Sequence, residues 1–65
     1  MNTKELKKFK KEAWSAGEND TITEDHLIQG AILFIEHEVL EEITDEQHEE
    51  IVEAYRAGFM GKKLS

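Results

Sequence analysis

The chain has 65 residues, an excess of acidic side chains that gives a net charge of −7, and neither cysteine nor proline. The absence of cysteine excludes disulfide bridges and zinc sites built from thiolates. A chain of this length forms one domain, and a core below about 70–80 residues rarely contributes more than about 3–5 kcal/mol. We therefore expect a single domain, residues 1–65, that gains support by associating with a second chain.

A first helix is expected over residues 3–16. Thr3 suits its N-cap, and Gly17 stands where a glycine in the left-handed conformation commonly ends a helix. Apolar residues recur along one face at helical spacing; they are Leu6, Phe9, Ala13 and Ala16. The other faces carry five lysines that make this helix basic, namely Lys4, Lys7, Lys8, Lys10 and Lys11.

A polar loop precedes a second helix, which is expected over residues 23–43. Thr23 suits its N-cap, and Ile22 and Leu27 have the spacing of a hydrophobic staple across the first turn. Thr21 offers an alternative N-cap two residues earlier. Both alternatives predict a helix start in this region.

The second helix is unusually apolar, because ten of the seventeen residues 27–43 are hydrophobic. On a helical wheel most of them fill one broad arc, whereas Leu33 and Leu40 form a second stripe on another side. A surface helix needs one apolar stripe only a little over about 100° wide. The pattern therefore predicts contacts on two sides, one within the molecule and one with a second chain.

The second stripe has the alternating four- and three-residue steps of a coiled-coil seam. Its members are His26, Gly30, Leu33, His37 and Leu40, with Thr44 continuing the series. Gly30 lets a partner backbone approach closely, and most small homo-oligomers are two-fold symmetric. We therefore expect an all-α domain of three helices that is completed as a homodimeric helical bundle.

A third helix is expected over residues 45–60, followed by a frayed tail over residues 61–65. Thr44 and Gln47 have the spacing of a capping box, which favours a break between the second and third helices after Ile43. No glycine or proline interrupts the sequence around this junction. One continuous helix therefore stays open as the alternative.

Two segments share a short pattern of glutamate, alanine, an aromatic residue, a variable residue, alanine and glycine. It occurs at residues 12–17 and again at residues 53–58. The pattern fits two equivalent recognition elements. We interpret it instead as two similar helix ends, in which the aromatic residue packs on a neighbouring helix and the small residues permit close approach.

An acidic block covers residues 36–50, which contain eight carboxylates and no lysine or arginine. Its acidic residues are Glu36, Glu38, Glu41, Glu42, Asp45, Glu46, Glu49 and Glu50. Carboxylates four residues apart repel one another on a helix and cost some stability. The block is either a solvated face or a surface whose negative field steers the protein onto a basic site of a partner.

Catalytic and metal sites have little support in the sequence. It contains no cysteine nucleophile, no glycine-rich phosphate loop and no nucleophile elbow. His26, His37 and His48 are each eleven residues apart, about 16 Å along one helix and too far for a single metal ion. We therefore expect no enzymatic activity, no cofactor and no metal site.

These features favour a non-enzymatic acidic protein-binding module, an inhibitor of the kind carried by phages and mobile elements. Its acidic surface is expected to dock on a basic site of a larger protein, such as a nucleic-acid-binding enzyme. The alternatives are nucleic-acid binding through the lysine-rich first helix, which the acidic remainder disfavours, and a structural role for the dimer itself. No stretch resembles a signal peptide or a membrane span, so we expect a cytoplasmic protein.

Overall fold

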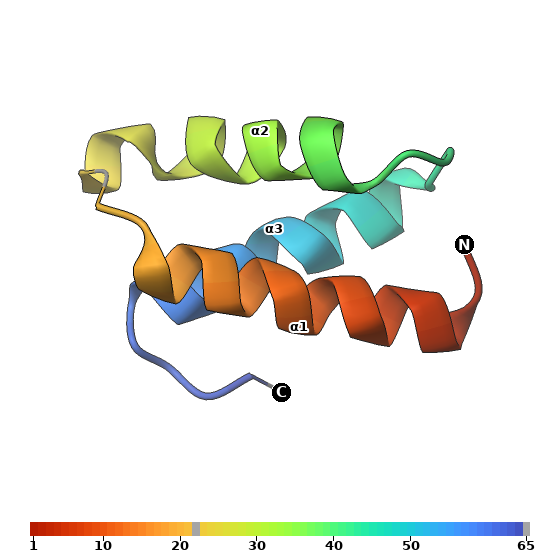
Figure 1. The fold of residues 1–65 in the computed structure, drawn as a ribbon, viewed down its shortest axis with the longest axis horizontal. Helices are drawn as coiled ribbons and strands as arrows, with labels where there is room; N and C mark the ends of the chain where they lie inside the picture. The colour runs from red at the N-terminus through yellow and green to blue at the C-terminus, as the bar shows by residue number, and fades with distance from the viewer. Residues whose placement is uncertain (22, 65) are drawn as a thin grey trace.

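The computed structural model describes residues 1–21 and 23–64, which form three α-helices and one short 3-10 helix. The helices are α1 (Thr3–Asn19), α2 (Leu27–Glu38) and α3 (Asp45–Phe59), and the 3-10 helix η1 (Glu24–His26) leads into α2. In Figure 1, α1 and α3 run in the same direction and α2 runs the opposite way. The expected all-α class with three helices is confirmed. Ile22 of the expected staple and Ser65 of the expected tail lie outside the described residues.

α1 and α3 cross where the repeated pattern occurs. Gly17 of α1 is buried against α3, and a Cβ atom added to it would overlap the carbonyl oxygen of Tyr55. Gly58 of α3 is buried against α1, and a Cβ atom added to it would overlap the carbonyl oxygen of Trp14. The contact is reciprocal, because the glycine of each copy of the pattern lies on the backbone of the aromatic residue of the other. The two segments therefore cross with their backbones in contact.

This crossing confirms that the small residues of the pattern permit close approach. Gly17 and Gly58 are needed for the space they leave and not for backbone conformation, since neither has a positive φ. The expectation that Gly17 ends the first helix in the left-handed conformation was wrong. α1 continues to Asn19, and Asp20 is its C-cap.

α2 covers the crossing of α1 and α3 and completes the core. Its inward side chains are Leu27, Ala31 and Ile35. The largest fully buried side chains, Ile51 and Tyr55, come from α3. The ring of Phe34 packs on the ring of Tyr55, with 6.4 Å between the centroids and 45° between the planes. Such tilted aromatic pairs add stability beyond the apolar area that they bury.

Side chains cap the first turns of α1 and α3. Asn2, one residue before the expected Thr3, accepts a hydrogen bond from the backbone N–H of Glu5 at 2.8 Å. Thr44 and Gln47 form the expected capping box, with hydrogen bonds of 3.0 and 3.1 Å between the backbone N–H of each and the side chain of the other. This confirms the break before α3 and contradicts one continuous helix.

α2 ends at Glu38, well before the expected end at Ile43. The next residue, Val39, adopts an extended backbone with φ −98° and ψ 99°, and its side chain is buried in the core. β-branched side chains suit extended backbone better than helix. Leaving the helix here also separates Glu38 from Glu42, which would repel each other on adjacent turns.

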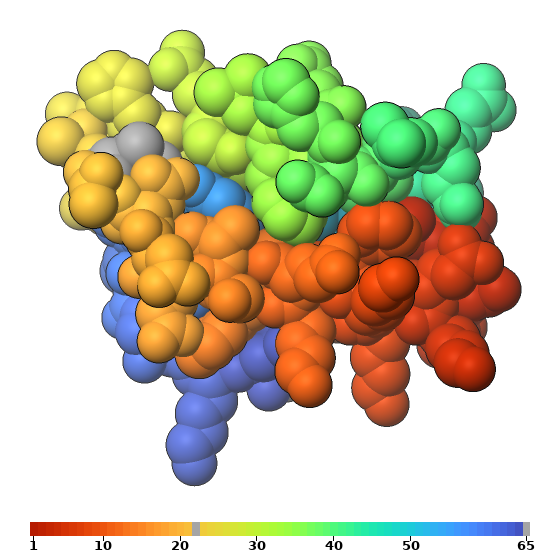
Figure 2. Space-filling model, viewed as in Figure 1, coloured from red at the N-terminus to blue at the C-terminus, as the bar shows by residue number. Residues whose placement is uncertain are grey.

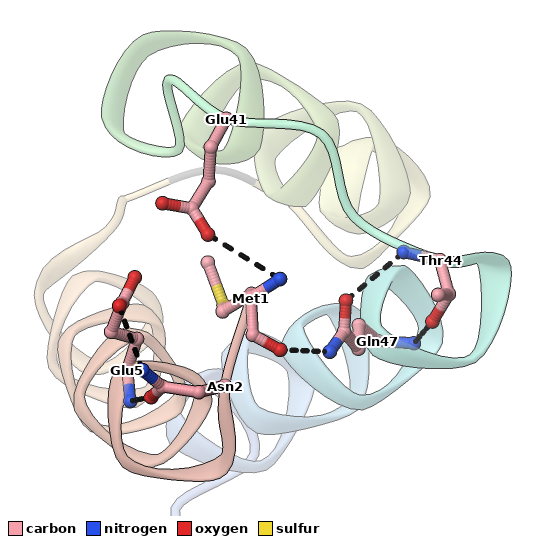
Figure 3. Close-up of polar contacts among 6 residues, drawn as sticks. All are labelled: Met1, Asn2, Glu5, Glu41, Thr44 and Gln47. Atoms are coloured by element: carbon pink, nitrogen blue, oxygen red, sulfur yellow. Dashed lines mark hydrogen bonds and ion pairs between the residues drawn. The ribbon is translucent and has the colours of Figure 1, made fainter.

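The first residue of the chain fixes the connection between α2 and α3 (Figure 3). The side chain of Met1 has no exposed surface, and its amino group lies 3.5 Å from the Glu41 carboxylate. The Met1 carbonyl accepts a hydrogen bond of 2.7 Å from the side chain of Gln47. Gln47 thus caps α3 and also binds the residue that leads into α1.

Residues 61–64 fold back onto the helices, so the expectation of a frayed tail was wrong for them. Gly61 has φ 74°, and the N–H groups of Gly61 and Lys62 bond back to the last turn of α3 at 3.1 and 2.8 Å. These two bonds make a Schellman motif. The indole N–H of Trp14 donates to the Lys62 carbonyl at 2.7 Å, and Leu64 packs against the core.

We expect Gly17→Ala and Gly58→Ala each to lower the free energy of unfolding by about 1–2 kcal/mol net. Overpacking costs about 1–3 kcal/mol, with backbone neighbours at the upper end, and outweighs the gain of about 1 kcal/mol in helix propensity. Urea unfolding followed by circular dichroism measures the change. Ser15→Ala, on the exposed side of α1, is the control, expected to stay within about 0.5 kcal/mol. Glycine variants as stable as this control would contradict the backbone contact.

Candidate functional site

A groove of about 400 Å³ lies along α3, between Lys10 of α1 and Leu64 of the C-terminal segment. Its apolar lining consists of Ala54, Ala57 and Leu64. Its acidic lining consists of Glu46, Glu49, Glu50 and Glu53. We call these four residues the acidic rim.

The rim is a direct consequence of helix geometry. Residues three, four and seven positions apart lie on the same side of an α-helix, and the rim residues have that spacing along α3. Lys10 supplies the opposing charge, with its Nζ 3.6 Å from the Glu50 carboxylate. Among residues 1–21 and 23–64, the other three rim carboxylates have no cation within ion-pair distance. The groove therefore combines an apolar lining with uncompensated negative charge.

The acidic block of the sequence is divided among α2, the connection and α3. Glu46, Glu49 and Glu50 line the groove. The remaining members lie in three places. Glu36 and Glu38 are in the last turn of α2, and Asp45 is at the start of α3. Glu41 and Glu42 are in the connection, where Glu41 is paired with the amino group of Met1. Glu53 belongs to the rim but follows the block in sequence. Its spacing of three and four residues from Glu50 and Glu49 is the signal that identifies it.

The expected dimer seam is not continuous, because α2 ends before Leu40. His26 lies in η1, where its Nδ1 is 2.9 Å from the hydroxyl of Thr23. Gly30, Leu33 and His37 lie on α2, whereas Leu40 lies in the connection and is 87% exposed. The structure therefore keeps only the middle of the expected seam on one helix.

The outer side of α2 nevertheless carries exposed apolar side chains, alongside exposed polar and charged ones. Ile28 and Leu33 are 52% and 53% exposed, and Ile32 is exposed as well. Ile28 and Ile32 were expected in the arc that faces the core. α2 faces the other helices on one side only, so a single stripe, with Ala31 and Ile35 in the middle, is enough to fill it.

The lysines of α1 divide into two sets. Lys4, Lys7, Lys8 and Lys11 are exposed, and their spacing places them on the side of α1 opposite the buried Ala13. Long side chains of α1 project from the lower edge of the molecule in Figure 2. Lys10 alone lines the groove. The expected basic helix thus presents four lysines to solvent and one to the acidic rim.

Neither a metal site nor a membrane span is found in the described parts of the chain. No three of their histidine, aspartate or glutamate side chains are grouped so that they could hold a metal ion. No helix among them is both long and apolar enough to cross a bilayer.

Tyr55 has a pKa that is clearly shifted from its usual value. Its ring is buried, and its hydroxyl donates a hydrogen bond to the Asp20 carboxylate. Burial raises the pKa of Tyr55 far above its usual value, and the hydrogen bond and negative charge of Asp20 raise it further. A shifted pKa often marks an active site. Tyr55 does not line the groove, however, and we interpret its bond to Asp20 as a structural link between α3 and the end of α1.

No protein-family model matches the sequence, and neither the curated proteins nor the solved structures give a significant match to the chain.

We expect Tyr55→Phe to lower the free energy of unfolding at pH 7 by about 1–2 kcal/mol, because a hydrogen bond to a carboxylate is lost. Since folding raises the pKa of Tyr55, its contribution is fully present below the unfolded pKa of about 10 and is lost as the pH rises above it. The difference between the two proteins should therefore shrink toward pH 11. Urea unfolding at both pH values measures it. A difference that is constant with pH would contradict the Tyr55–Asp20 bond.

Proposed function

We propose that the protein is a non-enzymatic acidic protein-binding module whose groove receives a basic segment of a larger protein. One observation carries the proposal. The groove is lined by four carboxylates, a single lysine and three apolar residues.

The chemistry of the groove suits lysine and arginine side chains. Their charged ends are attracted by the acidic rim, and their aliphatic stems can pack on partly exposed apolar residues of the groove such as Ala57 and Leu64. A field of one sign also steers a basic partner toward the groove and raises the association rate. The interaction should therefore be fast to form and sensitive to salt.

The partner that fits this chemistry best is a cytoplasmic nucleic-acid-binding enzyme. The basic surfaces of such enzymes are built to accept rows of phosphates, and carboxylates along α3 would take the place of those phosphates. A small protein that occupies such a surface acts as an inhibitor by exclusion.

We also propose that a second copy of the chain covers the outer side of α2. The exposed Ile28, Ile32 and Leu33 support this proposal. Clustered apolar side chains on a small domain commonly mark an interface. Two-fold pairing of α2 would leave the groove on α3 free for the basic partner.

A capture experiment tests the groove. The immobilised protein, Glu49→Gln/Glu53→Gln and Glu12→Gln/Glu18→Gln are exposed to a lysate of the native host. Both variants lose two negative charges, but only the first loses them from the groove. We expect one partner to be retained by the wild type and the control, to be lost by the groove variant, and to be released steeply above physiological salt. Equal capture by the groove variant would contradict the proposal.

Sedimentation equilibrium at micromolar concentration tests the dimer. We expect a particle of twice the 7.5 kDa chain mass. Leu33→Gln should shift the equilibrium toward the monomer, because it places an amide in the apolar contact. Met60→Gln, at an exposed apolar residue after α3, is the matched control and should leave the dimer intact. A folded wild-type particle of 7.5 kDa would overturn the proposed dimer.

A further inference from the structure

The ammonium group of Lys10 is itself a cation in the acidic groove. Lys10 lines the groove, and its side chain is 23% exposed, whereas the Glu50 side chain is 43% exposed. The distance of 3.6 Å between Lys10 Nζ and the Glu50 carboxylate is longer than the roughly 2.7–2.9 Å of a strong charge-assisted hydrogen bond. This pair is therefore loose and partly solvated, and such pairs contribute little to stability.

We infer that the groove binds an arginine side chain of the partner, and that this arginine displaces Lys10 from Glu50. The inference rests on the proposed function and adds to it the partner's chemical group and the residue that competes with it. Lys10 then acts as an internal competitor, which occupies the acidic rim until a better cation arrives.

Arginine suits this groove better than lysine for two reasons. The rim contains carboxylates four residues apart, Glu46 with Glu50 and Glu49 with Glu53, which lie on adjacent turns of α3. A guanidinium is a planar fork with five donors, so it can bond to two such carboxylates at once, whereas an ammonium is a compact point charge. A guanidinium is also less strongly hydrated, so it is more easily moved from water onto a partly apolar surface.

Displacement of Lys10 costs little free energy, because water can solvate its ammonium group once the group leaves Glu50. Lys10 lies on the side of α1 that faces the groove and is half-buried there. Its stem is flexible, so its ammonium can rotate into solvent without breaking the helix. The acidic rim therefore exchanges a weak internal pair for a bidentate contact, while the arginine stem packs on Ala57 and Leu64 of the groove lining.

Fluorescence anisotropy with two labelled helical peptides tests the inference at about 150 mM salt. One peptide carries four arginines at positions i, i+3, i+4 and i+7, and its twin carries four lysines. The proteins compared are the wild type, Lys10→Met and Lys11→Met. Both variants lose one positive charge, but only Lys10→Met removes it from the groove. Glu50→Gln is compared in the same way with Glu12→Gln, and circular dichroism verifies that each variant is folded.

We expect Lys10→Met to bind the arginine peptide about three- to fivefold more tightly, the size of a lost exposed ion pair. Lys11→Met should change the affinity less than about twofold, because salt screens charges beyond about 8 Å. Glu50→Gln should weaken binding, Glu12→Gln should not, and the lysine peptide should bind more weakly than the arginine peptide.

The possible failures are distinguishable. If neither peptide binds any of the proteins, the proposed function fails together with the inference. If Glu50→Gln weakens binding but Lys10→Met and Lys11→Met behave alike, the groove is a basic-peptide site and the competition by Lys10 is overturned. If the two peptides bind equally, the assignment to arginine is overturned.

Discussion

The backbone contact between α1 and α3 at Gly17 and Gly58 determines the rest of the structure. Because the helix backbones touch at these glycines, a side chain at either position would overlap the facing backbone. α2 covers the crossing with Leu27, Ala31 and Ile35. The groove is lined by small residues of the second copy of the pattern, Ala54 and Ala57. The pattern that allows close approach therefore also leaves the hollow that a partner can occupy.

Features that depend on neighbouring residues could be predicted from the sequence. The capping box of Thr44 and Gln47 was found because its two members are three residues apart. The end of α2 could not be found in this way, because it depends on the burial of Val39 in the core and on the contact of Glu41 with the first residue. Gly17 was misassigned for a related reason. A glycine after a helical stretch fits both a helix end and a close crossing, and only the position of Tyr55 on α3 distinguishes the two.

The candidate site was predictable only in part, because a groove is made by two segments. The spacing of Glu46, Glu49 and Glu50 could be read from the sequence as one stripe of α3. The arrival of Lys10 beside them depends on how α1 crosses α3. Lys10 has the same side-chain chemistry as its neighbour Lys11, and nothing local to the sequence sets it apart. The residue that we propose as the competitor is therefore one that only the tertiary structure identifies.

A domain of this size satisfies its polar groups inside and leaves its unpaired charge outside. Among the described residues, no buried side-chain nitrogen or oxygen atom lacks a hydrogen-bond partner. Tyr55, whose pKa is raised, is already bonded to Asp20. The exposed carboxylates of the rim and the exposed apolar side chains of α2 are still able to gain an interaction. A larger molecule could cover both surfaces without any rearrangement of the core, and this is the physical reason for proposing recognition as the function.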